Sequence, residues 1–75
     1  MNEFIANLAD QFYDTDISVF EPSTKFKELD EWASLIALAV MNMIEKKYGV
    51  PITPAEIRSR NTIQELFDLV MSKKA

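Results

Sequence analysis

The sequence predicts an all-α fold, a small four-helix bundle with three main helices, one short helix and a long first loop. Apolar residues recur at spacings of three and four over most of the chain, which is the pattern of helices with one buried face. The single glycine, Gly49, falls at a predicted helix end and Pro54 at a predicted helix start, whereas Pro22 breaks the periodicity between two helices. A chain of 75 residues has room for one core, so we expect residues 1–75 to form a single domain.

The first predicted helix covers residues 2–13. Its apolar side chains lie one, three or four positions apart and therefore share one helical face. They are Phe4, Ile5, Leu8, Ala9 and Phe12.

A long ordered loop with one short turn is predicted from Tyr13 to Asp30, because Pro22 and turn-forming residues break the periodicity there. A loop of this length is uncommon in a compact domain and often has a function. Several apolar side chains are expected to hold the loop against the core. They are Ile17, Val19, Phe20, Phe26 and Leu29.

The second predicted helix runs over residues 31–48. Asp30 is the expected N-cap before it, and Gly49 is the expected C-terminal stop after it. Lys46 and Lys47 near its end suit the negative end of the helix dipole.

Two capping boxes predict a short helix followed by the last helix. In the sequence TPAE, Thr53 is the expected N-cap, Pro54 suits the first helical position, and Glu56 closes the box. The sequence TIQE, from Thr62 to Glu65, repeats this pattern and begins the final helix. The inward side chains of that helix are Ile63, Leu66, Phe67 and Val70.

The helix over residues 31–48 divides into two faces when successive residues are rotated by about 100°. The predicted core face holds Ile36, Ala37, Val40, Met43, Ile44 and Tyr48. The opposite face holds Ser34, Leu35, Leu38, Asn42, Glu45 and Lys46, with Met41 at the border. Two interpretations stay open: a helix buried on all sides, or an exposed docking patch in which Leu35 and Leu38 flank the hydroxyl of Ser34.

Ser34 itself also allows two interpretations. A serine near the start of a helix is usually an ordinary capping residue. The free backbone N–H groups and the positive end of the helix dipole also favour an anion at this position. A phosphate on Ser34 would therefore be stabilised by roughly 0.3–1 kcal/mol.

The composition argues against several classes of protein. The chain has no cysteine for disulfides or thiolate metal sites, and no histidine for metal binding or proton transfer near pH 7. We therefore expect a protein that is not an enzyme and binds no metal.

The longest apolar run, residues 35–41, is too short for a membrane span, and the first residues do not form a targeting signal. A cytoplasmic protein is expected.

The net charge of −4 is unevenly distributed. Residues 1–33 hold eight acids and two bases, whereas residues 34–75 hold four acids and six bases. Nucleic-acid binding needs cations that replace phosphate counterions, so the acidic half argues against it and favours basic protein partners.

Three stretches together resemble the acyl carrier protein family, and the resemblance covers nearly the whole chain. FKELDEWASL, residues 26–35, resembles the family's aromatic residue, leucine and Asp-Ser-Leu at the start of its second helix. IEKKYGVPIT, residues 44–53, is similar to the end of that helix and the hydrophobic turn after it. NTIQELFDLV, residues 61–70, resembles the threonine-led last helix. The predicted order of helices is also the family's order.

The resemblance implies that Ser34 carries a covalent 4′-phosphopantetheine arm, delivered from coenzyme A by a phosphopantetheinyl transferase. Acyl intermediates would be held as thioesters on the arm and presented to partner enzymes of fatty-acid, polyketide or related biosynthesis. The thiol then belongs to the cofactor and the catalysis to the partners. Carriers of this kind are usually monomers. The docking residues implied for those partners are Glu31, Leu35, Leu38, Met41, Glu45 and Ile52, with the two glutamates at the rim.

The sequence departs from the family pattern at several positions. Ala33 stands where the fatty-acid members have aspartate before the serine, and Asp30 stands where a glycine is usual. The second helix has Glu45 as its only acid on the partner face, and Arg58 stands where acids are common on the short helix. These departures indicate a specialised carrier in which Asp30 and Glu31 replace the lost charge. They also leave open an unmodified helical interaction module with a carrier-like fold.

Overall fold

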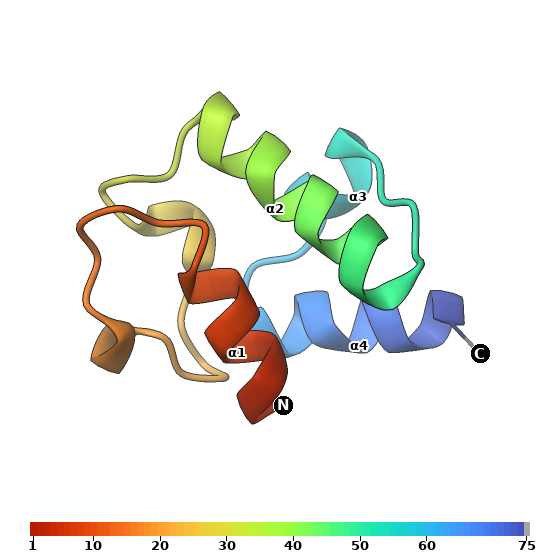
Figure 1. The fold of residues 1–75 in the computed structure, drawn as a ribbon, viewed down its shortest axis with the longest axis horizontal. Helices are drawn as coiled ribbons and strands as arrows, with labels where there is room; N and C mark the ends of the chain where they lie inside the picture. The colour runs from red at the N-terminus through yellow and green to blue at the C-terminus, as the bar shows by residue number, and fades with distance from the viewer. Residues whose placement is uncertain (75) are drawn as a thin grey trace.

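The computed structural model describes residues 1–74, and the regular elements within these residues are all helices, with no strand among them. The elements are α1 (Asn2–Ala9), the 3₁₀ turns η1 (Ile17–Val19) and η2 (Phe26–Glu28), α2 (Ser34–Tyr48), α3 (Pro54–Arg58) and α4 (Ile63–Lys74). Figure 1 shows α2 crossing the upper part of the molecule with α4 below it, while the long loop after α1 fills one side. The predicted all-α fold with three main helices and one short helix is confirmed.

The core consists of apolar side chains from all four helices and from the loop, and no polar or charged side chain within residues 1–74 is buried. An aromatic contact links the first and last helices, because the ring of Phe4 meets Phe67 edge-on with centroids 5.4 Å apart. Stability therefore rests on apolar burial and packing rather than on buried ion pairs. The fully buried large side chains are Phe4, Phe26, Leu8, Ile44, Ile63, Leu66, Val40 and Val70.

The first helix is shorter than the predicted span of residues 2–13, because α1 ends at Ala9. The chain then forms a tighter turn, in which the backbone N–H of Phe12 donates to the carbonyl of Ala9, three residues before it, at 3.0 Å. Phe12 turns into the core, where its ring packs edge-on against Phe20 with centroids 5.0 Å apart. The spacing of Phe12 from Leu8 therefore indicated burial and not a longer helix.

The long loop contains two 3₁₀ turns instead of the single turn predicted. Phe20 and Phe26 hold it to the core as expected. Ile17 and Val19 do not, because 62% and 42% of their surfaces are exposed. The part of the loop between η1 and η2 also pairs with α4, since the backbone N–H of Ile63 donates to the carbonyl of Thr24 at 3.0 Å. This bond gives a partner to one N–H group that the start of a helix leaves free.

The predicted helix boundaries after Tyr48 are correct. Gly49 ends α2 in the left-handed conformation, with φ of 67°, and its N–H donates to the carbonyl of Glu45 at 3.0 Å. Thr53 and Glu56 form the predicted capping box at the start of α3. In the second box, the N–H of Glu65 donates to the Thr62 hydroxyl at 3.1 Å, and Glu65 accepts in return from the N–H of Thr62.

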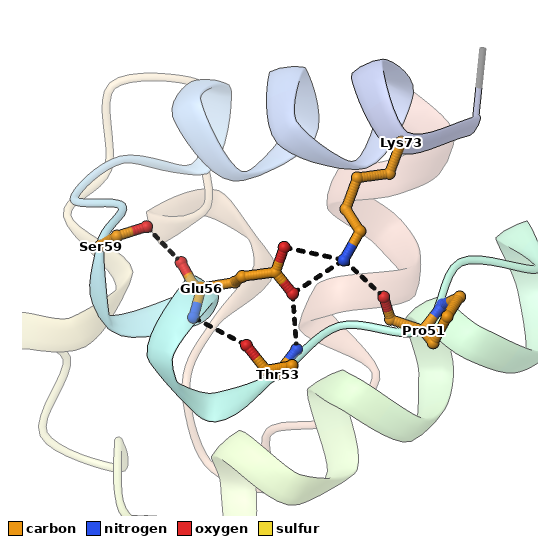
Figure 2. A network of polar contacts seen from close by, with 5 residues as sticks. All are labelled: Pro51, Thr53, Glu56, Ser59 and Lys73. Atoms are coloured by element: carbon orange, nitrogen blue, oxygen red, sulfur yellow. Dashed lines mark hydrogen bonds and ion pairs between the residues drawn. The ribbon is translucent and has the colours of Figure 1, made fainter.

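Lys73 ties the last helix to the start of α3. Its ammonium group donates to both carboxylate oxygens of Glu56 at 2.7 and 2.8 Å and to the carbonyl of Pro51 at 2.7 Å (Figure 2). The ammonium group of Lys73 holds the pKa of Glu56 below the ordinary value of a glutamate, with help from the backbone N–H of Thr53. This network fixes α3, and with it one wall of the site described next.

Candidate functional site

The second helix begins three residues later than predicted, at Ser34 rather than at residue 31. Asp30 is therefore not its cap. The chain makes a turn before the helix, in which the N–H of Trp32 donates to the carbonyl of Leu29 at 2.9 Å. The N-cap position is filled by Ala33, whose backbone is extended and whose side chain cannot accept a hydrogen bond.

Trp32 anchors the turn that leads into α2. Its ring meets Phe26 edge-on with centroids 5.2 Å apart and lies over Phe12 at 6.4 Å. Trp32 is half-buried against the core. Because two aromatic contacts fix this ring, the start of α2 two residues later has a defined position.

Ser34 is the first helical residue, its side chain is exposed, and its hydroxyl forms no hydrogen bond within residues 1–74. The first backbone bond of the helix runs from the N–H of Ala37 to the carbonyl of Ala33, at 2.9 Å. The N–H groups of residues 34–36 consequently have no partner in the helix. Ser34 thus presents a free hydroxyl at the positive end of a 15-residue helix.

The two faces of α2 are those predicted from the sequence. Ile36, Val40, Met43 and Ile44 are buried, whereas the side chains on the opposite face are exposed. Leu35 and Leu38 are 68% and 51% exposed. A helix buried on all sides is therefore wrong, and α2 carries an exposed pair of leucines beside Ser34.

The remaining predicted docking residues differ in their surroundings. Met41 and Ile52 are half-buried against the core, and Glu45 is exposed on α2. Glu31 faces the long loop, where its carboxylate accepts the backbone N–H groups of Tyr13 and Asp14 at 2.9 and 2.8 Å.

The hydroxyl of Thr15 also donates to Glu31, and this bond holds the pKa of the Glu31 carboxyl below its ordinary value. Asp30 and Glu31 line a hollow on the loop side together with Asp14 and Asp16. They are not among the residues that line the cleft at Ser34. The carboxylate of Glu31 is engaged by the loop, and the replacement of an aspartate at position 33 by these two acids stays a prediction.

Ser34 opens onto a cleft of about 300 Å³ between α2 and α3. Its lining is mostly apolar and contains one cation and no acid. The lining residues are Trp32, Ala33, Ser34, Ala37, Met41, Pro54, Ile57 and Arg58.

Sequence reasoning had not grouped these residues, although one signal was present. Ile57 and Arg58 follow Pro54 by three and four positions in a capped helix, and the three residues therefore lie on one side of it. That α2 lies opposite this face could be learned only from the structure. The described residues include no cluster of metal-binding side chains, and no helix among them is long and apolar enough to cross a membrane.

Comparison with known proteins agrees with this geometry. The family model "Phosphopantetheine attachment site" matches residues 2–70. The chain is also similar to "Polyketide-8 synthase acyl carrier protein 2" of Streptomyces avermitilis, with 31% identity over 71 residues, 95% of this chain and 82% of that protein. No solved structure gives a significant match. Members of the matched family hold 4′-phosphopantetheine covalently and act as carriers rather than enzymes. This chain belongs to the phosphopantetheine-binding acyl carrier protein family.

Proposed function

We propose that Ser34 is the attachment residue, and that the protein carries acyl intermediates as thioesters on the arm joined to its hydroxyl. The observation that carries this proposal is the exposed, unpartnered hydroxyl at the first residue of α2. Another serine of the chain, Ser59, differs in this respect because its hydroxyl donates to the carbonyl of Glu56 at 2.6 Å.

The surroundings of Ser34 suit a phosphodiester. The free N–H groups of residues 34–36 and the helix dipole favour negative charge at this point. Arg58 lines the same cleft, and no carboxylate lies among the lining residues to repel an anion. The thiol at the far end of the arm would hold the cargo, which supports a carrier built from a chain without cysteine.

The attachment is a transfer from coenzyme A on a phosphopantetheinyl transferase. The Oγ atom of Ser34 forms a bond to the phosphorus atom that bears the pantetheine portion, and the phosphoanhydride bond of coenzyme A breaks. Adenosine 3′,5′-bisphosphate leaves, and the hydroxyl proton passes to a base on the transferase. The residue is accessible to such an enzyme because it lies on the exposed face of α2.

For the partners of the loaded protein, we propose docking on an apolar patch made of Leu35, Leu38 and Met41, with Ile52 beyond it and Glu45 at the rim. The exposure of the two leucines supports this assignment. Glu31 is the weakest member of the proposed surface, since its carboxylate is engaged by the long loop. With little acid on α2, partner choice should depend on apolar contact more than on charge steering.

The name of the relative favours acyl-transfer and synthase enzymes of polyketide assembly as partners, and fatty-acid synthesis is the second candidate. Both pathways suit the proposed thioester chemistry. A cytoplasmic location and a monomeric state remain predictions.

The test of attachment uses purified protein, coenzyme A and a broad-specificity transferase, followed by intact-mass measurement. We expect the wild type and Ser59→Ala to gain the mass of one phosphopantetheine group and Ser34→Ala to gain none. Failure of the wild type with several transferases would favour the unmodified interaction module instead. A gain in Ser34→Ala would assign the arm to another residue.

A further inference from the structure

We propose that Glu31 is a positioning residue for the attachment of the arm, because its carboxylate makes α2 begin at Ser34 instead of one turn earlier. Glu31 acts through the backbone of residues 31–33 and not by contact with the arm. The inference rests on the proposed function, since the position of Ser34 matters for loading only if Ser34 receives the arm. It gives Glu31 a role other than contact with a partner enzyme.

The carboxylate of Glu31 joins two segments that are far apart in the sequence. Its Oε2 atom accepts the backbone N–H of Tyr13 at 2.9 Å. Its Oε1 atom accepts the backbone N–H of Asp14 at 2.8 Å and the hydroxyl of Thr15. These three hydrogen bonds, which we call the Glu31 clamp, fix residue 31 against the start of the long loop.

The residues before Ser34 favour a helix that begins one turn earlier than the observed one. Aspartate is among the best N-cap residues, so Asp30 is suited to cap a helix that begins at residue 31. Alanine has the highest helix propensity and is a poor N-cap, yet Ala33 is at the N-cap of α2 with φ of −156° and ψ of 174°. Local preference and observed conformation therefore disagree, so contacts outside the helix decide where α2 begins.

The start of α2 decides what surrounds the hydroxyl of Ser34. A helix that began at residue 31 would pair the N–H groups of residues 34–36 with the carbonyls of residues 30–32. Its positive end would lie about 4.5 Å further along the axis from Ser34. A phosphate transferred to the serine would then lose the free N–H donors and much of the dipole. The Glu31 clamp thus preserves the features of α2 that suit the attachment.

The aromatic contacts of Trp32 act together with the Glu31 clamp. The ring packs on Phe26 and on Phe12, and a longer helix would have to move it. Loss of the clamp therefore shifts an equilibrium between two starts of α2 and does not abolish the observed one. Removal of a single hydrogen bond shifts such an equilibrium by about twofold to tenfold.

Two variants weaken the clamp without favouring the longer helix through propensity. Thr15→Val removes one donor and leaves the sequence around Ser34 unchanged. Glu31→Gln removes the charge, and glutamine has nearly the helix propensity of glutamate. Glu28→Gln is the matched control, because it removes an exposed acid three residues before Glu31 that is not part of the clamp.

NMR of the unloaded protein reads the start of α2 directly. In Thr15→Val and Glu31→Gln, the Cα chemical shifts of residues 31–33 should move towards helical values. Amide hydrogen exchange at Leu35 and Ile36 should become slower, because the longer helix pairs these N–H groups. It should slow by about twofold once the two starts are equally populated. A simple loss of stability would instead leave exchange at these two residues unchanged or faster.

Loading by a phosphopantetheinyl transferase measures the functional consequence. In both clamp variants kcat/KM should fall in proportion to the population of the longer helix, by about twofold at equal populations, while Glu28→Gln loads as the wild type does. If Glu31 acted by contact with the transferase instead, Glu31→Gln would load more slowly and Thr15→Val would match the wild type.

That second pattern of loading would overturn the inference. Unchanged chemical shifts and exchange in both clamp variants would also overturn it, as would wild-type loading of a variant whose helix has lengthened. A wild type that gains no mass would overturn the proposed function and with it the positioning role. The exchange data on the unloaded protein would still show where α2 begins, so the two failures can be distinguished.

Discussion

Replacing Ala33 by aspartate should stabilise the protein, because Ala33 occupies the N-cap of α2 without a capping side chain. Its φ and ψ of −156° and 174° are already extended, as a capping residue requires, and its side chain is exposed, so no neighbour has to move. The N–H groups of Leu35 and Ile36 are free to donate to a new carboxylate. A cap of this kind contributes about 1 kcal/mol, within a range of roughly 0.5–2 kcal/mol.

In a domain of this size, 1 kcal/mol raises the melting temperature by about 4–8 °C. Thermal unfolding followed by circular dichroism measures this shift for the unloaded protein. Ala33→Asn is the control that adds the cap without the charge, and the difference between the two variants gives the helix-dipole contribution, about 0.3–1 kcal/mol. That difference should vanish when the pH falls below the pKa of the new aspartate.

An unchanged or lower melting temperature in both variants would refute the reasoning, since it would mean that α2 does not begin at Ser34. The same aspartate restores the residue usual before the serine in the fatty-acid carriers. If the missing charge limits recognition by the transferase, Ala33→Asp should load faster than Ala33→Asn. Equal loading rates would separate the stability effect from recognition.

The remaining predictions concern the core, a helix end and pH. Leu66→Ala should lower the free energy of unfolding by about 2–5 kcal/mol, because the side chain of Leu66 is fully buried. Leu38→Ala should change it by less than about 0.5 kcal/mol, because Leu38 is exposed. Equal urea midpoints for the two variants would contradict the assigned faces. Gly49→Ala should lower the free energy of unfolding by about 1 kcal/mol through the φ of 67° alone, since a Cβ at this position meets no atom within 4 Å. Gly49→Asn should lower it by less, and an alanine variant of unchanged stability would argue against the left-handed end of α2. The pKa of Glu56 is lowered in the folded state by the ammonium group of Lys73, so the folded protein binds fewer protons than the unfolded chain. The stabilising effect of ionised Glu56 should be complete above about pH 5 and should disappear as the pH falls through the folded pKa, below about pH 4.3. Urea midpoints that rise on acidification would contradict this sign.

The features predicted correctly from sequence are those decided by neighbouring residues. The capping boxes at Thr53 and Thr62 contain both of the groups that satisfy one another, so the starts of α3 and α4 could be located. Gly49 acts through its own backbone, and the end of α2 was located equally well. The faces of α2 followed from helical periodicity.

The features that were wrong depend on contacts across the fold. The start of α2 was misplaced because Glu31 accepts hydrogen bonds from residues 13–15, which keeps the chain before Ser34 out of the helix. The end of α1 was misplaced because Phe12 packs on Phe20 and Trp32. Sequence patterns record that a side chain is buried, but not which distant segment buries it.

The candidate site also has one part that could be predicted from neighbouring residues and one part that depends on contacts across the fold. The position of Ser34 near a helix start and the exposed leucines beside it could be predicted from one helix alone. The cleft could not be predicted, because its shape depends on the orientation of α3 against α2. Arg58 had been noted only as a departure from the family, and the structure gives it a defined place opposite the serine's helix.

The claim that Ser34 carries the arm is tested most directly by peptide-level mass spectrometry of the loaded protein. Fragmentation of the peptide around Ser34 should locate one phosphopantetheine group on that residue, with none on Ser18, Ser23, Ser59 or Ser72. An arm found on any of those four serines, or an unmodified peptide around Ser34 in a protein whose intact mass has increased, would contradict the account.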